Sequence, residues 1–365
     1  GILTISEKWK RHLSSDSIYY KTEDYLKEKF PAFEKDSAVI YINGAICPTK
    51  ELVSEVKKLK EAERLVLKHD GKIITVAECI NINSDYLTIS EIECTFKPTI
   101  IKNLWDIFSK NGEQLLQDFE LLTKGRKSQP ISKTNQVIKP ENIFLEEGAI
   151  VECAILNASS GPIYVGKDAE IMEGSIVRGG LALCEHSALK LGAKIYGPTT
   201  IGPYSKVGGE VTNSVILGYS NKGHDGFLGN SVLGEWCNIG ADSNNSNLKN
   251  NYAEVKLWNY PQEKFVGTGL QFCGLIMGDH SKCGINTMFN TGTVVGVSAN
   301  IFGAGFPRNF LPSFSWGGAA GITTYRLKDA IETAERVYER RGKKFDEVEQ
   351  KIFAHVFEQT EKFRK

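Results

Sequence analysis

The middle of the chain repeats every six residues, and this period constrains the fold more than any other feature. Eight aliphatic residues occupy consecutive positions of the repeat: Val165, Ile171, Val177, Leu183, Leu189, Ile195, Ile201 and Val207. A helix repeats near every 3.6 residues and a half-buried strand every 2, so neither alone explains a period of six. Hexapeptide repeats are typical of a parallel β-helix, in which each repeat forms one side of a three-sided coil. We expect these aliphatic side chains to point into its core.

The same spacing returns downstream in a shifted frame. We assign interior positions to Val215, Phe227, Leu233 and Ile239, and we interpret Asn221 as an interruption. A later run keeps the interval as well: Met277, Cys283, Phe289, Val295 and Ile301. The repeat therefore predicts that the β-helix extends to about residue 306.

Three parts are predicted for the 365-residue chain. Residues 1–137 have the alternating patterns of an α/β domain, 138–318 form the β-helix, and 319–365 form a C-terminal helical segment. Because Gly1–Ile5 is apolar and opens the chain abruptly, we expect a further segment to precede it.

Local patterns give the main elements of these parts. An apolar run predicts a buried strand over 38–42, and His69-Asp70-Gly71 indicates a hairpin turn. Residues 243–267 depart from the repeat and are predicted to form a projecting loop. A long helix is expected over 326–363, interrupted at Gly342, with an apolar stripe that packs on the end of the β-helix or on a neighbouring subunit.

Composition limits the classes of binding partner and the cellular compartment that we expect for this chain. The 44 basic and 44 acidic residues cancel, so no basic excess favours nucleic acid or an anionic membrane surface. No apolar run reaches the roughly 18 residues of a membrane span. The eight cysteines form no CxxC pair, and the six histidines do not cluster, which favours reduced thiols in a cytoplasmic protein over disulfides or a metal site.

The segment 218–229 interrupts the repeat and is where chemistry is most expected. It places Lys222, His224 and Asp225 beside glycines that would admit a ligand closely. A histidine on a rigid wall suits a general base that takes a proton from an amine attacking a thioester. A backbone N–H at the next corner would then stabilise the oxyanion. The alternative is a surface or structural histidine, which we prefer for His186 and His280.

Longer motifs resemble a known family. They are Gly1–Trp9, Gly192–Tyr204, Asn221–Gly229, Asn238–Ala241, Asn244–Tyr252 and Ser313–Gly318. Together they resemble the GlmU family, in which a sugar nucleotidyltransferase domain precedes a left-handed β-helix with acetyltransferase activity. The match is closer to a GlmU-like branch described as sugar-1-phosphate nucleotidyltransferases. The resemblance implies a homotrimer that acts on a small sugar phosphate or nucleotide sugar.

The resemblance also implies roles for individual residues. His224 matches the general base of the acetyltransferase, and Asn238 and Asn247 match asparagines near the amino sugar. Ala241 matches the position whose backbone contacts acetyl-coenzyme A.

The phosphate site departs from the family. An arginine and a lysine that clamp the sugar phosphate there align with Gly208 and with Thr212 or Asn213 here. Neutral residues cannot form charge-assisted hydrogen bonds to phosphate. Either the acyl acceptor differs from that of the family, or other cations substitute for the clamp. For the second case we assign Lys206 and Lys222 to substrate binding. Further candidates are Lys256 and Arg178. Two family tyrosines are also replaced, by Phe227 and Leu248.

The N-terminal part departs too. It lacks the Gly-x-Gly-Thr-Arg loop with which sugar nucleotidyltransferases hold nucleotide phosphates. Asn43 stands where an acid that binds Mg²⁺ is expected, and an amide is a poorer ligand for this ion than a carboxylate. Two explanations stay open: the domain is reduced, or the expected preceding segment carries these residues.

Three functions remain open at this point. The first is acyl transfer, with acetyl-coenzyme A as donor and an amino-sugar phosphate or nucleotide sugar as acceptor. The second is Mg²⁺-dependent sugar-1-phosphate nucleotidyl transfer, with the β-helix as trimerisation domain. The third is a trimeric scaffold that binds a nucleotide sugar without catalysis.

Overall fold

A computed structural model of the chain describes residues 1–69, 71–81 and 83–364. It divides into two compact units, residues 3–103 and residues 1–2 with 104–365. The predicted boundary at residue 137 differs from this division, because the helices after residue 103 pack on the β-helix. The side-chain amide of Asn111, for example, donates to the carbonyl of Pro198 at 3.1 Å.

The unit of residues 3–103 is an α/β layer around a four-stranded sheet in the order β1-β3-β2-β4. Its elements are α1 (Ile5–Leu13), η1 (Asp24–Leu26), β1 (Val39–Ile42), α2 (Lys50–Val56), β2 (Glu63–His69), β3 (Lys72–Ile80) and β4 (Ser90–Glu93). The predicted strand over 38–42 is present as β1, although its residues are only partly buried. The predicted hairpin is confirmed, since β2 and β3 pair antiparallel. Asp70 of the hairpin turn lies outside the described residues.

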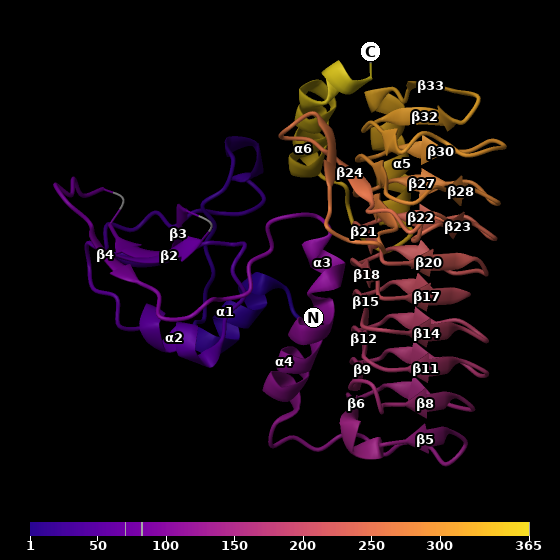
Figure 1. The fold of residues 1–365 in the computed structure, drawn as a ribbon, viewed down its shortest axis with the longest axis horizontal. Helices are drawn as coiled ribbons and strands as arrows, with labels where there is room; N and C mark the ends of the chain where they lie inside the picture. The colour runs from indigo at the N-terminus through magenta and orange to yellow at the C-terminus, as the bar shows by residue number, and fades with distance from the viewer. Residues whose placement is uncertain (70, 82, 365) are drawn as a thin grey trace. The chain divides into compact units, whose positions relative to one another are not determined.

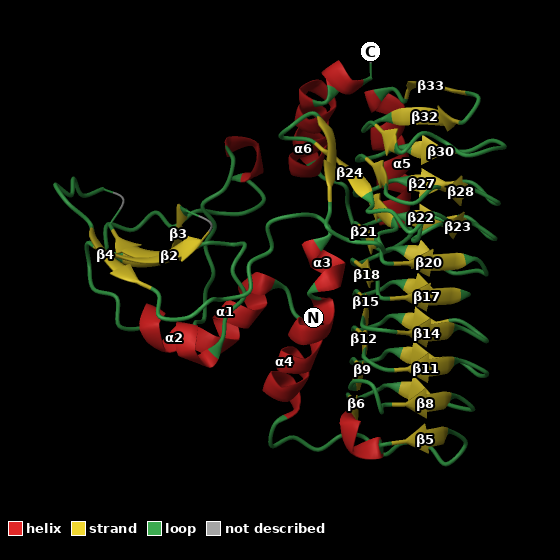
Figure 2. Ribbon diagram, in the orientation of Figure 1, coloured by secondary structure: helices red, strands yellow, loops and turns green. Residues whose placement is uncertain are grey.

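The second unit is built on a β-helix whose strands stack coil upon coil into three walls (Figures 1 and 2). The ten-stranded wall consists of β7 (Ile150–Val151), β10 (Glu170–Ile171), β13 (Ala188–Leu189), β16 (Lys206–Val207), β19 (Asn221–Lys222), β22 (Asn238–Ile239), β27 (Lys282–Cys283), β30 (Asn300–Ile301), β32 (Ser315–Gly318) and β33 (Gly321–Thr324). The six-stranded wall consists of β5 (Gln136–Ile138), β8 (Ile155–Asn157), β11 (Ile176–Arg178), β14 (Lys194–Tyr196), β17 (Glu210–Thr212) and β20 (Phe227–Gly229). Neighbouring coils pair in parallel, as at β16 and β19.

The third, nine-stranded wall consists of β6 (Ile143–Leu145), β9 (Ile163–Val165), β12 (Leu181–Leu183), β15 (Thr199–Ile201), β18 (Val215–Ile216), β21 (Val232–Leu233), β26 (Leu275–Met277), β29 (Thr293–Val295) and β31 (Phe310–Leu311). A two-stranded sheet of β23 (Asn244–Asn245) and β28 (Met288–Phe289) lies among the later coils. The predicted projecting loop contains a hairpin, β24 (Lys256–Asn259) and β25 (Lys264–Gly267). The predicted left-handed parallel β-helix of hexapeptide repeats is thus the architecture of this unit.

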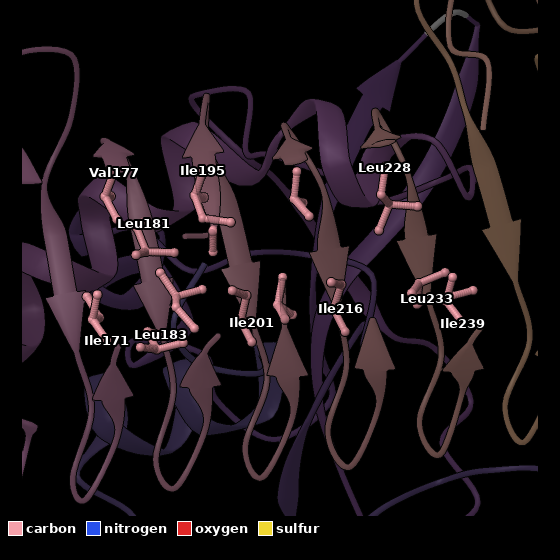
Figure 3. Packing of buried hydrophobic residues seen from close by; sticks show 14 of the residues in the cluster. Ile171, Val177, Leu181, Leu183, Ile195, Ile201, Ile216, Leu228, Leu233 and Ile239 are labelled. Atoms are coloured by element: carbon pink, nitrogen blue, oxygen red, sulfur yellow. The ribbon is translucent and has the colours of Figure 1, made fainter. Parts of the chain in front are cut away.

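The interior of the β-helix is filled by the residues that the six-residue period selected. All eight aliphatic residues from Val165 to Val207 are at most 1% exposed and belong to one core cluster. Figure 3 shows Ile171, Val177, Leu183, Ile195 and Ile201 pointing into the space between the walls.

The frame assigned after Val207 was wrong by one residue at two positions. Ile216 and Leu228 join the core cluster, whereas Val215 and Phe227 do not. Two shortened intervals cause the shift. Only Gly208–Gly209 separate β16 from β17, against four residues between β13 and β14, so the interior residue Val211 follows Val207 by four positions instead of six. The next interior residue, Ile216, then follows Val211 by five.

A conservative pair of substitutions tests which side chains fill the core. Ile195→Val should destabilise the fold by about 0.5–1.5 kcal/mol, because it deletes a buried methylene and leaves a void. The matched control Ile150→Val changes a side chain that is 55% exposed and should change the unfolding free energy little. Equal effects in denaturant titrations of both variants would contradict the assigned interior.

In the part of the chain that the structure describes, six helical segments accompany the β-helix. They are α3 (Asp106–Ser109), α4 (Asn111–Thr123), η2 (Pro140–Asn142), α5 (Leu327–Glu339), α6 (Glu347–Gln359) and η3 (Glu361–Phe363). The predicted C-terminal stripe is buried on the protein's own β-helix: Ala330, Ala334 and Tyr338 pack in a cluster with Trp236 and Phe314. The sequence prediction of a break near Gly342 is confirmed, since α5 and α6 flank it.

Two further features bear on the predictions from composition. Among the described residues, no helix has the length and hydropathy needed to cross a bilayer. The eight cysteines are free thiols, seven of them buried, and Cys153 is exposed.

Candidate functional site

His224 lies in a corner of residues 223–226 that joins β19 on the ten-stranded wall to β20 on the six-stranded wall; we call it the His224 corner. It sits directly on the two-glycine corner of the preceding coil. A Cβ placed on Gly209 would lie 2.8 Å from the carbonyl oxygen of His224 and 2.9 Å from Cα of Asp225. Gly209 also has a φ of +70°, which side chains disfavour. Glycine is therefore required for this close stacking.

Lys222 fixes the His224 corner from inside the β-helix. Its register partner on β16 is the core residue Val207, and its side chain is 1% exposed. The ammonium donates to the carbonyl of His224 at 2.7 Å and to that of Gly208 at 3.1 Å. Burial lowers the pKa of Lys222 to about 8, although nearby carboxylates oppose this shift. The sequence analysis assigned Lys222 to an outer wall beside the substrate, whereas the structure places its charge in the interior.

The His224 side chain itself is exposed, and Ala241 lies at the same edge one coil later. The two corners are joined by a hydrogen bond from the N–H of Asp242 to the carbonyl of Asp225, at 3.0 Å. The structure thus brings together the predicted base and the predicted contact for the acyl donor.

The ten-stranded wall presents a polar row next to this corner. Lys206, Asn221 and Asn238 pair across β16, β19 and β22, so their backbones are about 4.8 Å apart from strand to strand. Lys206 and Asn238 are exposed. Asn221, in the middle of this row, precedes His224 by three residues, so the predicted substrate-binding residues Lys206 and Asn238 lie on the wall that leads into the His224 corner.

Asn247 lies elsewhere in the single chain. It follows β23, near the corner between the six-stranded and nine-stranded walls, and its amide donates to Oδ1 of Asn230 at 2.8 Å. Arg178 on β11 and Lys256 on β24 also lie off the ten-stranded wall. These residues do not join His224 within one copy of the chain.

Sequence reasoning missed Arg341. This residue lies in the turn between α5 and α6, and Nη2 of its guanidinium donates to Oδ1 of Asn221 at 3.4 Å. The run Arg340-Arg341-Gly342-Lys343-Lys344 at the helix break is a basic signal that could have drawn attention to it. Its proximity to Asn221, 120 residues away in sequence, follows only from tertiary packing.

The α/β unit offers little that would hold Mg²⁺. Asn43 accepts from the N–H of Ala45 at 3.0 Å and donates to the carbonyl of Thr75 at 3.1 Å, so its amide shapes the turn after β1. Within residues 1–69, 71–81 and 83–364, no three histidine, cysteine or acidic residues converge as metal ligands. Where an acid that binds Mg²⁺ is expected, the chain therefore offers a neutral amide that is engaged in a turn.

Comparisons with known proteins support the resemblance seen in the sequence. Residues 1–127 match the model of a family described as sugar nucleotidyl transferase. The bifunctional sugar-1-phosphate nucleotidylyltransferase/acetyltransferase of Sulfurisphaera tokodaii is 29% identical over 144 residues, which are 39% of this chain and 35% of the relative. The bifunctional protein GlmU of Methanocaldococcus jannaschii is 33% identical over 87 residues, 24% of this chain and 21% of the relative.

The predicted similarity to GlmU-type proteins is confirmed, and the chain is related to transferases. The matched regions span about a third or less of these curated relatives.

Among solved structures, the UDP-N-acetylglucosamine acyltransferase from Campylobacter jejuni is similar at a TM-score of 0.27 and 15% identity, covering 64% of this chain and 83% of its own. The acyltransferase of the same name from Francisella novicida gives a TM-score of 0.24 and 12% identity, with coverage of 63% and 92%. Likeness at this level supports no conclusion about chemistry.

Proposed function

We propose that the β-helix transfers an acetyl group from acetyl-coenzyme A to the amino group of an amino-sugar phosphate or nucleotide sugar. The observation on which this rests is the His224 corner, because an exposed imidazole stands on a backbone that is held by a buried lysine and by glycine stacking. A general base must come within hydrogen-bond reach of the proton that it removes, and an exposed imidazole on a fixed backbone is accessible to an attacking amine.

In the proposed reaction, His224 removes a proton from the attacking amine as the new C–N bond forms at the thioester carbonyl. Collapse of the tetrahedral intermediate breaks the C–S bond, and the thiolate of coenzyme A leaves and takes up a proton. Asn238 would orient the sugar from the ten-stranded wall, and the backbone at Ala241 would face the donor.

An acceptor panel tests this function. Release of free coenzyme A is measured from acetyl-coenzyme A with glucosamine 1-phosphate, glucosamine 6-phosphate and amino-sugar nucleotides. We expect turnover with at least one amino sugar, and none with the matching hydroxyl sugar, since the reaction needs an amine. Absence of turnover with every acceptor would reject acyl transfer for this chain.

A second candidate is sugar-1-phosphate nucleotidyl transfer, which the match of residues 1–127 favours. We rank it below acyl transfer, because Asn43 stands where the Mg²⁺-binding acid is expected and its amide is engaged in the turn after β1. Release of pyrophosphate from a nucleoside triphosphate and a sugar 1-phosphate, dependent on Mg²⁺, would reverse this order.

We further propose that the active form is a cytoplasmic homotrimer with the site between copies. The six-stranded wall and its continuation expose apolar side chains, among them Ile155, Ile176 and Met288, each at least 36% exposed. Such a wall would be covered in a closed threefold assembly. Association would also bring Asn247 of one copy toward the His224 corner of another. We expect light scattering to give three times the monomer mass, and a monomer alone would refute the assembly.

A further inference from the structure

The C-terminal helices are held against the β-helix by stacked aromatic rings. His186, Tyr204, Tyr219 and Trp236 stack in successive coils at the corner before the ten-stranded wall, with ring centroids 4.2–4.9 Å apart. Tyr338 of α5 then stacks on Trp236 at 4.0 Å. Because aromatic pairs of this geometry are favourable, α5 is placed firmly beside the wall.

The turn after α5 consequently places positively charged side chains beside the ten-stranded wall. Arg341 reaches Asn221, as described above. The ammonium of Lys343 lies 5.0 Å from the ring centroid of Tyr219, two residues before Asn221 in the same coil. Two cations from the turn thus lie next to one strand of the β-helix.

The wall itself supplies a third cation and an amide. Lys206 precedes Asn221 in the parallel ladder and Asn238 follows it. At the same position of the two preceding strands, Lys206 is followed back along the wall by Ala188 and then by Glu170. The nearest carboxylate in this row is therefore two strands away from Lys206. Contact with Asn221 uses one of the five N–H donors of the Arg341 guanidinium, whose planar fork suits a phosphate.

We propose that Arg341, with Lys206 and Lys343, forms the site that binds a phosphate or diphosphate group of the substrate. The proposal rests on the proposed acyl transfer for the identity of the substrate, and it supplies a cationic site where the sequence has lost the expected clamp. The C-terminal turn, rather than the β-helix alone, provides the guanidinium. Charge-assisted bidentate bonds from arginine to phosphate are among the strongest hydrogen bonds that a protein makes.

Either of two reactants could supply the phosphate group that binds to this site. The acceptor sugar bears a phosphate, and coenzyme A bears a diphosphate and a further phosphate. Binding measured separately for glucosamine 1-phosphate and for coenzyme A distinguishes them, with glucosamine as the acceptor that lacks phosphate.

The experiment is isothermal titration of the full chain, as wild type and as Arg341→Gln. The matched control is Arg340→Gln, which removes an exposed charge one residue away. We expect Arg341→Gln to weaken binding of one phosphate-bearing ligand about 10-fold to 100-fold, and Arg340→Gln to weaken it far less. Binding of glucosamine should not change, and Lys206→Gln should weaken the same ligand as Arg341→Gln.

If Arg341→Gln binds glucosamine 1-phosphate more weakly, the site belongs to the acceptor. If it binds coenzyme A more weakly, the site belongs to the donor. Equal binding by the two arginine variants, or no binding of either ligand by the wild type, would overturn the proposal. Melting curves of both variants establish that the fold is intact. The titrations measure ligand affinity and need no turnover, so they test the phosphate site even if the protein does not transfer acetyl groups.

Discussion

Replacing His224 by alanine is expected to lower the rate of acetyl transfer by about 10²–10⁴-fold, the range associated with loss of a general base. The fold should be retained, since the side chain is exposed. Lys222 holds the carbonyl of His224 rather than its imidazole, so alanine at this position keeps the hydrogen bond that shapes the corner. The effect should therefore fall on kcat, measured with saturating acetyl-coenzyme A and the preferred amino sugar.

His186→Ala is the matched control for this experiment. His186 is also an exposed histidine at a corner of the β-helix, but it belongs to the aromatic stack on the opposite edge of the ten-stranded wall. We expect its replacement to leave kcat within a few-fold of the wild type. Unchanged turnover in His224→Ala, with both variants folded, would remove His224 from the mechanism.

The second large effect concerns the buried charge of Lys222. Its pKa falls from an ordinary value of 10.5 to about 8 in the fold, because burial penalises the ammonium. Below pH 8 the lysine is protonated in both the folded and the unfolded chain, and the fold bears the full cost of the buried charge. Between about pH 8 and 10.5 the folded chain releases the proton while the unfolded chain retains it. Stability contributed by this residue therefore rises with pH across that window.

The rise amounts to about 3 kcal/mol, at 1.36 kcal/mol for each pKa unit. Lys222→Met removes the titrating group, and the difference in unfolding free energy between wild type and variant isolates it from other alkaline titrations. Between pH 7.5 and 10.5, we expect the unfolding free energy of the wild type to rise relative to that of Lys222→Met by up to this amount, as measured in denaturant titrations. A difference that stays constant with pH would show that the ammonium is not buried.

The same variant separates two roles for Lys222. If Lys222 contacts the substrate, its replacement should raise KM for the acceptor. If Lys222 positions the His224 corner, its replacement should instead lower kcat, because the carbonyls of Gly208 and His224 lose their donor and the corner shifts.

The β-helix could be predicted because its information is local. Each hexapeptide builds one strand and one corner, so the positions of Val165 to Val207 in the sequence are also their positions in the core. The same logic failed after Val207, because two successive intervals are shorter than six residues, from Val207 to Val211 and from Val211 to Ile216, and the hydrophobic pattern does not mark them clearly. Lys222 was misplaced for that reason: in the shifted frame it takes an interior position that an aliphatic residue holds in the coil before.

By itself, the sequence determined the three-walled coil, the break between the C-terminal helices and the corner in which His224 stands, since all three depend on residues that are close together in the chain. Only the tertiary structure decided which way the Lys222 charge points and which cation reaches Asn221. Both depend on groups from different coils and helices meeting in space: Lys222 bonds the carbonyls of two successive corners, and Arg341 reaches the wall because Tyr338 stacks on Trp236. Contacts of this kind arise from packing, and a periodic pattern along the chain does not encode them.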